Sequence, residues 1–362
     1  MKQIFFVGSY TAGDSSAASG QGIYTCTLES STGQMVLESC FEACKNPSYL
    51  ALDEENRRLF AVEECAAELS PAVRAFTINE GFAVEPLNSR SVPGGAPCYL
   101  ALDADKRFLT VANYSTGNVL LYPLGRDGTI GEIADNVYHT DYHTGRSVNL
   151  DRREAAHPHA TVFGPNNQTV YVPDLGTDEI VSYWLGTEGV KLEPLSRLKM
   201  PAGAGPRHLV FHPEEPVAFV LNELDSSLSV LRRYGYELTL LSSVPTLPAG
   251  FQGENTGAAV RVHLSGDFVY ASNRGNDSVA VFRFERAAQR LHSVQHIASQ
   301  GQIPRDFALD PEGKLAVVAN QQTNNLVSFW INDETGKLEP TGYRLDIGTP
   351  VCIAMTNLRV YL

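Results

Sequence analysis

The stretch GAGPRHLVFHP, at residues 203–213, places Arg207 and His208 side by side where a loop enters an apolar segment. A guanidinium group carries a planar fork of donors that suits carboxylate and phosphate groups. A histidine changes its charge near neutral pH and can transfer a proton. Because charged residues are unusual at the start of a buried strand, this pair indicates either a structural contact between loops or an anion-binding site.

Seven segments of this kind recur along the chain, 46 to 61 residues apart. They begin at Asn46, Ala96, His157, Gly205, Thr256, Ile303 and Thr349. The second position is proline in six of them and Gly257 in the other. Each segment continues as a short apolar run, a polar turn and further alternating runs, which are strand and hairpin signals. No stretch shows convincing helical periodicity.

Four strands repeated at this spacing are typical of a propeller blade. The seventh segment has little chain after its first strand, and residues 2–40 supply the strands that it lacks. We therefore predict an all-β fold: a seven-bladed β-propeller with four-stranded antiparallel blades, the last blade closed by both termini. Residues 1–362 form a single domain in this prediction. Closure of the ring removes exposed sheet edges.

Alignment of the repeats brings together residues that are far apart in the sequence. The position after the proline holds Ser48, Cys98, His159, Arg207, Ala258, Arg305 and Val351 in chain order. The residues that follow the end of the second strand are Glu64, Tyr114, Asp174, Glu223, Arg274 and Gln321. The first strand of a blade lines the central channel of a propeller. We expect the arginines and histidines of this set, with His208, to form a local anion site.

The composition excludes several classes of partner. The chain has 28 basic and 41 acidic residues and a net charge of −13. Phosphate backbones and anionic membranes repel such a chain, so we expect no nucleic acid and no membrane partner. The N-terminal apolar run is too short for a signal peptide. The six cysteines show no CxxC spacing, which predicts reduced thiols in a cytoplasmic protein.

The motif HPHA offers an alternative, a metal site. His157 and His159 are spaced to share one strand face, and further candidate ligands are His139, Asp141 and His143. We nevertheless predict no metal and no cofactor. Pro158 marks a loop end, and the neighbouring arginines would repel a divalent cation.

Other candidates are assigned by their position in the repeat. His212 and His263 lie at the far ends of their strands and are predicted to be structural. Arg261 interrupts an apolar strand, and alternation does not decide which face it takes. We include it as substrate-binding, together with His208 and Arg305. The polar segment 125–156 accounts for the widest repeat spacing and is predicted to be a long surface loop over one channel mouth.

The motifs GPRHLVFHP, VLNELDSSLSV, YASNRGNDSVAVF and IPRDFALDPEGKLAVVAN resemble the seven-bladed propeller lactonase family. The resemblance extends from Gln3 to Val360. This family contains bacterial propeller-type 6-phosphogluconolactonases and fungal carboxy-muconate lactonising enzymes. It implies a catalytic group, which in this sequence is His159, Arg207, Glu223 and Arg274. Arg305 also matches a family arginine.

The predicted residues are compatible with both chemistries of that family. Hydrolysis of a lactone needs a general base and a positive environment for the developing oxyanion. His159 or Glu223 is the base, Arg207 and Arg274 stabilise the oxyanion, and another arginine holds a phosphate. We predict a lactonase that opens an anionic sugar lactone, 6-phosphogluconolactone, in the pentose phosphate pathway. The alternatives are a cycloisomerase acting on a dicarboxylate and a non-catalytic propeller that binds other proteins.

Overall fold

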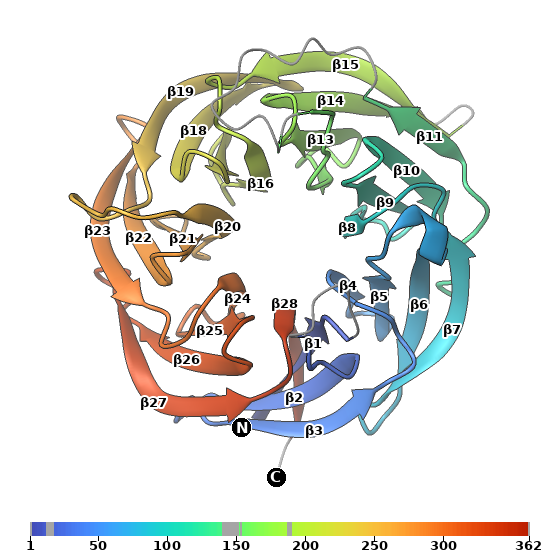
Figure 1. Ribbon diagram of the computed structural model, residues 1–362, viewed down its shortest axis with the longest axis horizontal. Coiled ribbons are helices and arrows are strands. Elements are labelled where there is room, and N and C mark those ends of the chain that lie inside the picture. Colours follow the sequence, from blue (N-terminus) through green and yellow to red (C-terminus); the bar gives the residue numbers. More distant parts are fainter. Residues whose placement is uncertain (1, 12–17, 140–151, 153, 187–189, 361–362) are drawn as a thin grey trace.

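The computed structural model describes residues 2–11, 18–139, 152, 154–186 and 190–360. Within these residues the chain forms seven four-stranded antiparallel sheets, which radiate from a common axis (Figure 1). The all-β, seven-bladed propeller expected from the repeats is confirmed. Among the described residues, no helix has the length and apolar character needed to span a bilayer.

Blades 1 to 6 each contain four strands that are consecutive in the sequence. Blade 1 contains β4 (Leu50–Asp53), β5 (Arg58–Val62), β6 (Ala72–Ile78) and β7 (Val84–Ser91), with the short 3-10 helix η1 (Ala67–Leu69) between β5 and β6. Blade 2 contains β8 (Pro97–Leu102), β9 (Phe108–Asn113), β10 (Asn118–Pro123) and β11 (Asp135–Tyr138). Blade 3 contains β12 (Val162–Phe163), β13 (Thr169–Asp174), β14 (Glu179–Gly186) and β15 (Lys191–Lys199).

The second half of the ring repeats this arrangement. Blade 4 contains β16 (Pro206–Phe211), β17 (Val217–Asn222), β18 (Ser227–Tyr234) and β19 (Glu237–Pro245). Blade 5 contains β20 (Thr256–Val262), β21 (Phe268–Arg274), β22 (Ser278–Glu285) and β23 (Arg290–Ala298). Blade 6 contains β24 (Pro304–Leu309), β25 (Leu315–Asn320), β26 (Asn325–Ile331) and β27 (Leu338–Asp346).

The seventh sheet, the closing blade, joins the two ends of the chain. Its strands are β28 (Pro350–Val360), β1 (Lys2–Ser9), β2 (Ile23–Glu29) and β3 (Met35–Phe41), in that order from the axis outward. β28 is the innermost strand and pairs antiparallel with β1, so that Val7 lies opposite Ile353. Closure of the last blade by both termini is therefore confirmed.

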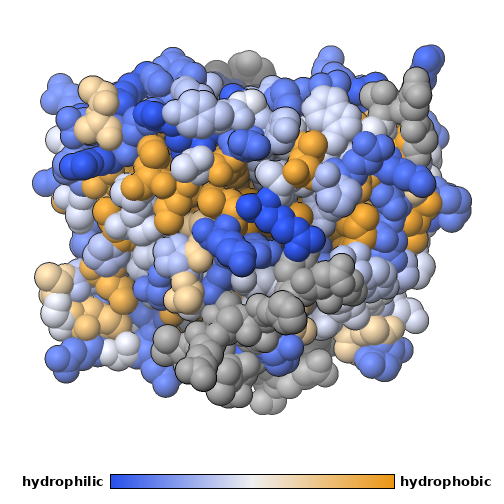
Figure 2. All heavy atoms as spheres, turned by 90° about the horizontal axis from the view of Figure 1, so that it is seen from above, coloured by the Kyte–Doolittle hydropathy of each residue, from blue (hydrophilic) through white to orange (hydrophobic). Residues whose placement is uncertain are grey.

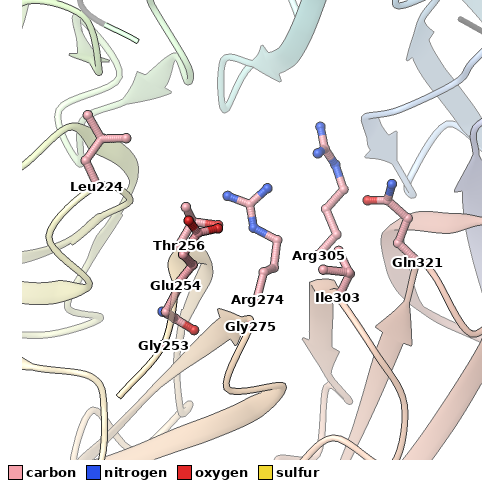
Figure 3. Close-up of a pocket in the computed structure, with 10 residues that line it drawn as sticks. Leu224, Gly253, Glu254, Thr256, Arg274, Gly275, Ile303, Arg305 and Gln321 are labelled. Carbon is pink, nitrogen blue, oxygen red and sulfur yellow. The ribbon is translucent and has the colours of Figure 1, made fainter. Parts of the chain in front are cut away.

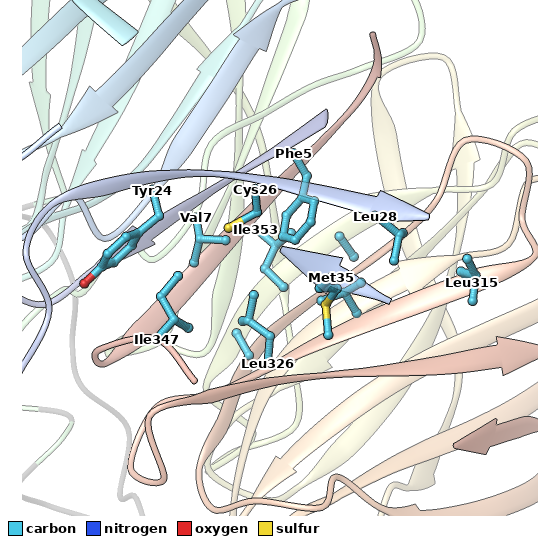
Figure 4. Close-up of a cluster of buried hydrophobic side chains, with 13 residues drawn as sticks. Phe5, Val7, Tyr24, Cys26, Leu28, Met35, Leu315, Leu326, Ile347 and Ile353 are labelled. Carbon is cyan, nitrogen blue, oxygen red and sulfur yellow. The ribbon is translucent and has the colours of Figure 1, made fainter. Parts of the chain in front are cut away.

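Burial follows the position of each strand in its blade. All six residues of β25, LAVVAN, are buried, because neighbouring blades cover both faces of the strand. The outermost strand β19 alternates between exposed and covered positions. Apolar layers fill the space between blades, as where Phe5 and Val7 pack with Leu326 between the closing blade and blade 6 (Figure 4). The side of the ring is a mosaic of hydrophilic and hydrophobic residues (Figure 2).

The two histidines predicted to be structural fix turns between the first and second strands of their blades. His212 Nδ1 accepts hydrogen bonds from the backbone N–H groups of Glu214, at 3.0 Å, and Glu215, at 2.9 Å. His263 Nδ1 accepts one from Ser265 N at 3.3 Å, and its Nε2 lies 2.9 Å from the Gly313 carbonyl oxygen. Their structural role is confirmed.

Candidate active site

A β-bulge at the start of the innermost strand orients the side chains of the predicted site. In blade 4, Pro206 pairs with Asn222 and His208 pairs with Leu221, so that Arg207 is an extra residue between the two pairs. Blade 6 shows the same register shift between Pro304 and Asp306, which leaves Arg305 as the extra residue. A bulge interrupts the regular alternation of a strand. This explains how Arg207 and His208, adjacent in sequence, both contact residues of other blades near the axis.

The residue before the bulge has a left-handed backbone in several blades. Gly205 has a φ of 62°, and the β-branched residues Ile303 and Thr349 have φ values of 58° and 36°. Such angles are rare for β-branched residues, and each is expected to cost about 1–3 kcal/mol. Gly205 also lies against Leu224, whose Cγ is 2.5 Å from the position that a Cβ would take. The turns at Ile303 and Thr349 are therefore strained, whereas glycine avoids this strain in the turn before Arg207.

Glu223, which follows β17, is the centre of a group of charged side chains. Its Oε2 lies 2.9 Å from Arg207 Nε and 3.0 Å from Arg274 Nη2. Its Oε1 accepts a hydrogen bond from Arg152 Nη2 at 2.9 Å. His159 Nε2 lies 4.0 Å from Oε2. The structure thus brings together all four residues of the predicted catalytic group.

The electrostatic balance at Glu223 favours the carboxylate. Burial opposes its ionisation, since the side chain is only 2% exposed. The guanidinium groups of Arg274 and Arg207 outweigh this effect and hold the pKa of Glu223 well below its usual range. Glu223 is therefore charged at neutral pH and is a weak base.

The backbone of Glu223 explains the exception in the sequence repeat. The Glu223 N–H donates to the Gly205 carbonyl oxygen at 2.7 Å, and the Gly257 N–H donates to the Glu223 carbonyl oxygen at 3.0 Å. Proline has no N–H and could not make the second bond. Glycine at position 257 therefore ties blade 5 to the site residue of blade 4.

His159 is buried between the charged group and blade 2. Its Nδ1 lies 3.8 Å from the Cys98 Sγ, and its ring meets that of Tyr114 edge to face at a centroid distance of 5.5 Å. Burial and the charge of Arg207 hold the pKa of His159 well below its ordinary value. The imidazole is therefore neutral at pH 7 and can accept a proton.

His208 supports Arg207 from the other side. Its Nε2 lies 3.0 Å from Arg207 Nη1, which also donates to the Ala258 carbonyl oxygen. Burial and the adjacent Arg207 hold the pKa of His208 well below its ordinary value, so the ring is a neutral acceptor. Burial and Arg274 lower the pKa of Arg207 to about 10, which leaves it charged at neutral pH.

Arg274 and Arg305 border an open cavity of about 880 Å³ between blades 4, 5 and 6. They extend in the same direction from neighbouring blades (Figure 3). The Arg305 guanidinium lies over the ring of Tyr10, 5.1 Å from its centroid, and 3.9 Å from Glu64 Oε2. The other polar side chains of the cavity wall are Glu254, Asn255, Thr256 and Gln321.

Arg261 lies apart from the other predicted residues. Its Nη2 donates to Asp306 Oδ1 at 2.6 Å, and its guanidinium lies 5.7 Å from the centre of the Phe307 ring. It borders a separate cavity of about 330 Å³ with Leu264 and Pro311, residues at the far ends of β20 and β24. The structure does not bring Arg261 into the group around Glu223.

The residues of the alternative metal site have other partners. His157 Nδ1 lies 2.8 Å from the Tyr114 carbonyl oxygen, and its Nε2 lies 3.0 Å from Glu154 Oε1. His139 Nδ1 lies 2.6 Å from Asp174 Oδ2. The other two candidate ligands, Asp141 and His143, lie outside the described residues. The prediction that the segment 125–156 is one long surface loop is wrong for residues 135–138, which pair with β10 and form β11, the outermost strand of blade 2. Residues 140–151 and 153 of the segment lie outside the described residues.

The site contains residues that the sequence analysis did not select. Glu64 and Tyr114 occupy the position of the repeat that Glu223 occupies in blade 4. Tyr10 occupies the same position in the closing blade, for which the sequence alignment named no residue. Alignment of residues 3–10 with the second strands of the other repeats would have placed Tyr10 in this set. Arg152 lies outside the aligned positions of the repeat, so no pattern in the sequence identifies it as a site residue.

This geometry defines a propeller whose channel holds a neutral histidine beside an ionised glutamate and several arginines. A family model described as "Lactonase, 7-bladed beta-propeller" matches residues 4–355. The chain is 32% identical over 354 residues to the 6-phosphogluconolactonase of Bacillus subtilis, which covers 97% of this chain and 98% of that protein. It is 29% identical over 340 residues to a 6-phosphogluconolactonase of Formosa agariphila, which covers 92% of this chain and 94% of that protein.

A solved structure of a lactonase also resembles this chain. The Pseudomonas aeruginosa periplasmic gluconolactonase PpgL superposes with a TM-score of 0.91 at 27% identity, covering 99% of this chain and 100% of that one. The chain belongs to the family of seven-bladed β-propeller lactonases. It is accordingly a lactonase, and the alternative of a non-catalytic propeller is not supported.

Proposed function

We propose that this lactonase hydrolyses the lactone of an anionic sugar acid and that its substrate is 6-phosphogluconolactone. The observation that carries the proposal is the neutral imidazole of His159 4.0 Å from an ionised Glu223, which Arg207 and Arg274 hold in place. Such a group can accept a proton from water and stabilise the resulting positive charge.

His159 is the general base in this proposal. It takes a proton from a water molecule, whose oxygen attacks the lactone carbonyl carbon. The carboxylate of Glu223 then stabilises the imidazolium, since its Oε2 makes no well-aligned hydrogen bond among the described residues and can accept one. Glu223 itself is disfavoured as the base because Arg207, Arg274 and Arg152 surround its carboxylate and hold it as an anion.

The arginines have separate roles in this proposal. Arg274 lines the cavity and stabilises the oxyanion of the tetrahedral intermediate, while Arg207, 3% exposed, holds Glu223 in its ionised form. The ring C–O bond then breaks, and the imidazolium returns its proton to the leaving alkoxide. Arg305 binds the phosphate, because among the described residues its guanidinium makes no hydrogen bond and borders the same cavity.

The wall of the cavity favours a sugar over a muconate. Glu254, Asn255, Thr256 and Gln321 offer donors and acceptors for several hydroxyl groups. A carboxy-muconate offers carboxylates and an unsaturated chain instead. A cytoplasmic location is part of the same proposal: the six cysteines are all free.

The test is the addition of purified protein to freshly generated 6-phosphogluconolactone, with ring opening followed against the spontaneous rate. We expect rapid hydrolysis, and unchanged activity after dialysis against a chelator because the reaction uses no metal. Turnover of a carboxy-muconate with no effect on the sugar lactone would instead establish the cycloisomerase.

A further inference from the structure

At one mouth of the channel, which we call the rim, blade 3 contributes no side chain from the end of its second strand. The residue after the second strand points toward neighbouring rim residues in several blades, as Tyr10 does toward Glu64 and Glu223 toward Arg274. In blade 3 the equivalent residue, Asp174, is fully buried. Its Oδ2 lies 2.6 Å from His139 Nδ1, and its Oδ1 accepts backbone hydrogen bonds from His157, Gly176 and Thr177. Asp174 is therefore committed to the turns of its own blade and its surroundings.

Arg152 fills the position that Asp174 leaves. It belongs to the chain between β11 and β12, not to a strand of the propeller. Its Nε donates to the Tyr114 hydroxyl at 2.9 Å and its Nη2 to Glu223 Oε1 at 2.9 Å. Tyr114 is the rim residue of blade 2 and Glu223 that of blade 4, so Arg152 joins the two across blade 3.

The charge of Arg152 is not needed to balance the described site. The other charged groups near the cavity are Arg207, Arg274 and Arg305 against Glu64, Glu223 and Glu254, which compensate one another. Arg152 is paired with Glu223, and with it the four arginines of this group outnumber its three glutamates by one. Its side chain is 38% exposed, compared with 3% for Arg207 and 12% for Arg274. Among the described residues, its Nη1 has no hydrogen-bond partner. A half-buried arginine that keeps a donor nitrogen free beside one ion pair is suited to an incoming anion.

We propose that Arg152 is a specificity-determining residue that binds the anionic group of the substrate. This inference rests on the proposed function and deepens it. Arg152 would add its charge and its free Nη1 donor to the attraction that Arg305 exerts on a phosphate group, which carries about −1.5 to −2 charges at neutral pH. Arg152 thereby makes the site selective for a phosphorylated sugar lactone over an uncharged one.

The test compares two substrates in three variants. Arg152→Gln removes the charge, Arg152→Lys keeps it without the planar fork, and Arg290→Gln on the outer strand β23 is the matched control. For 6-phosphogluconolactone we expect kcat/KM to fall about 10- to 100-fold in Arg152→Gln, as for the loss of a charge-assisted hydrogen bond, and less in Arg152→Lys. For unphosphorylated gluconolactone we expect a clearly smaller fall in Arg152→Gln, because only the contact with Glu223 is lost for this substrate, and no change in Arg290→Gln.

Two results would overturn the inference. An equal loss on both lactones would mean that Arg152 acts through Glu223 alone, and no loss on either would make it a spectator. Calorimetric titration with the products separates this inference from the proposed function. If the unchanged protein hydrolyses neither lactone but binds 6-phosphogluconate, and Arg152→Gln abolishes this binding, the proposed reaction fails and the anion site stands. If it neither hydrolyses the lactones nor binds 6-phosphogluconate, both proposals fail.

Discussion

At the scale of single residues, the site depends on pairs of groups that change each other's protonation. Glu223 remains ionised in a buried position because Arg274 and Arg207 offset its desolvation. Burial, together with the charge of Arg207, lowers the pKa of His159 and of His208 and keeps both neutral. An ionised acid beside a neutral base is the combination required for proton transfer from water at pH 7.

Substitutions at Arg207 and Glu223 test whether this group is chemical or structural. Arg207→Lys keeps the charge, Arg207→Ala loses it, and Glu223→Gln is nearly isosteric. We expect activity per folded molecule to fall in Arg207→Lys and to fall further in Arg207→Ala. The difference in activation free energy between the two variants should be about 1–3 kcal/mol, the size of a charge-assisted hydrogen bond. Glu223→Gln should lose activity while its backbone bonds to Gly205 and Gly257 keep it folded.

The measurements are lactone hydrolysis and the folded fraction from circular dichroism of the same samples. A structural role for the group predicts that residual activity simply tracks the folded fraction. Near-normal turnover in all three variants and in His159→Ala would show that the channel cluster is scaffolding.

The buried histidines also predict how stability depends on pH. Burial and Arg207 hold the pKa of His208 below its unfolded value of about 6.5, so the folded state binds fewer protons than the unfolded state. Stability is then fully present above about pH 6.5 and falls as the pH decreases toward the folded pKa, by up to about 1.4 kcal/mol per pH unit for each such histidine.

His208→Gln removes one of these titrations. We expect the free energy of unfolding, measured by denaturant titration between about pH 5 and 6.5, to fall less steeply in the variant than in the unchanged protein. Its stability at neutral pH can decrease as well, because Arg207 loses a neutral acceptor. An identical slope in both proteins would show that His208 is not kept neutral by burial.

At the scale of elements, a turn between the second and third strands of blade 3 packs against the segment that leads to His159. Gly176, in the turn after β13, lies close to the segment that carries the HPHA motif. A Cβ at this position would lie 1.9 Å from the Ala155 carbonyl oxygen and 2.9 Å from His157 Cδ2. Because the first neighbour is backbone, the segment before His159 would have to move.

Gly176→Ala therefore tests the link between this turn and the site. We expect a loss of about 1–3 kcal/mol in stability, as for overpacking of a well-packed interior, and a fall in kcat larger than the change in KM. Gly81→Ala is the control, since a Cβ there meets only the Asn79 side chain, at 3.4 Å. Thermal unfolding and steady-state kinetics give both quantities, and equal behaviour of the two variants would contradict the link.

At the scale of the whole molecule, the ring is closed by hydrogen bonds between the two ends of the chain. β28 pairs with β1 and lies against the innermost strands β24 and β4 of the adjacent blades. It supplies the innermost layer of the closing blade. Tyr10 and Arg305, which stack near the cavity, lie on either side of this junction.

Deletion of residues 349–362 removes β28 and should open the ring. We expect an aggregated or molten product, because β1 loses its pairing partner and a sheet edge becomes exposed at the axis. Near-UV circular dichroism and thermal unfolding measure the effect. A truncated protein that still unfolds cooperatively at an unchanged temperature would show that closure by β28 is dispensable.

The sequence by itself determined the architecture, because the repeated proline, the turns and the strand alternation are local signals that recur at regular spacing. The same alignment placed Glu223, Arg274 and His159 near one another, since equivalent positions of different blades surround one axis. Resemblance to a family was needed to separate Glu223 from its equivalents Glu64 and Asp174.

Only the tertiary structure decided the partners of each side chain. It separated Arg261, which pairs with Asp306, from the arginines around Glu223. It also brought Arg152 to Glu223 from an insertion that obeys no repeat. The physical reason is that periodicity fixes the position of a strand residue, whereas the contact of a loop residue depends on packing between segments distant in sequence.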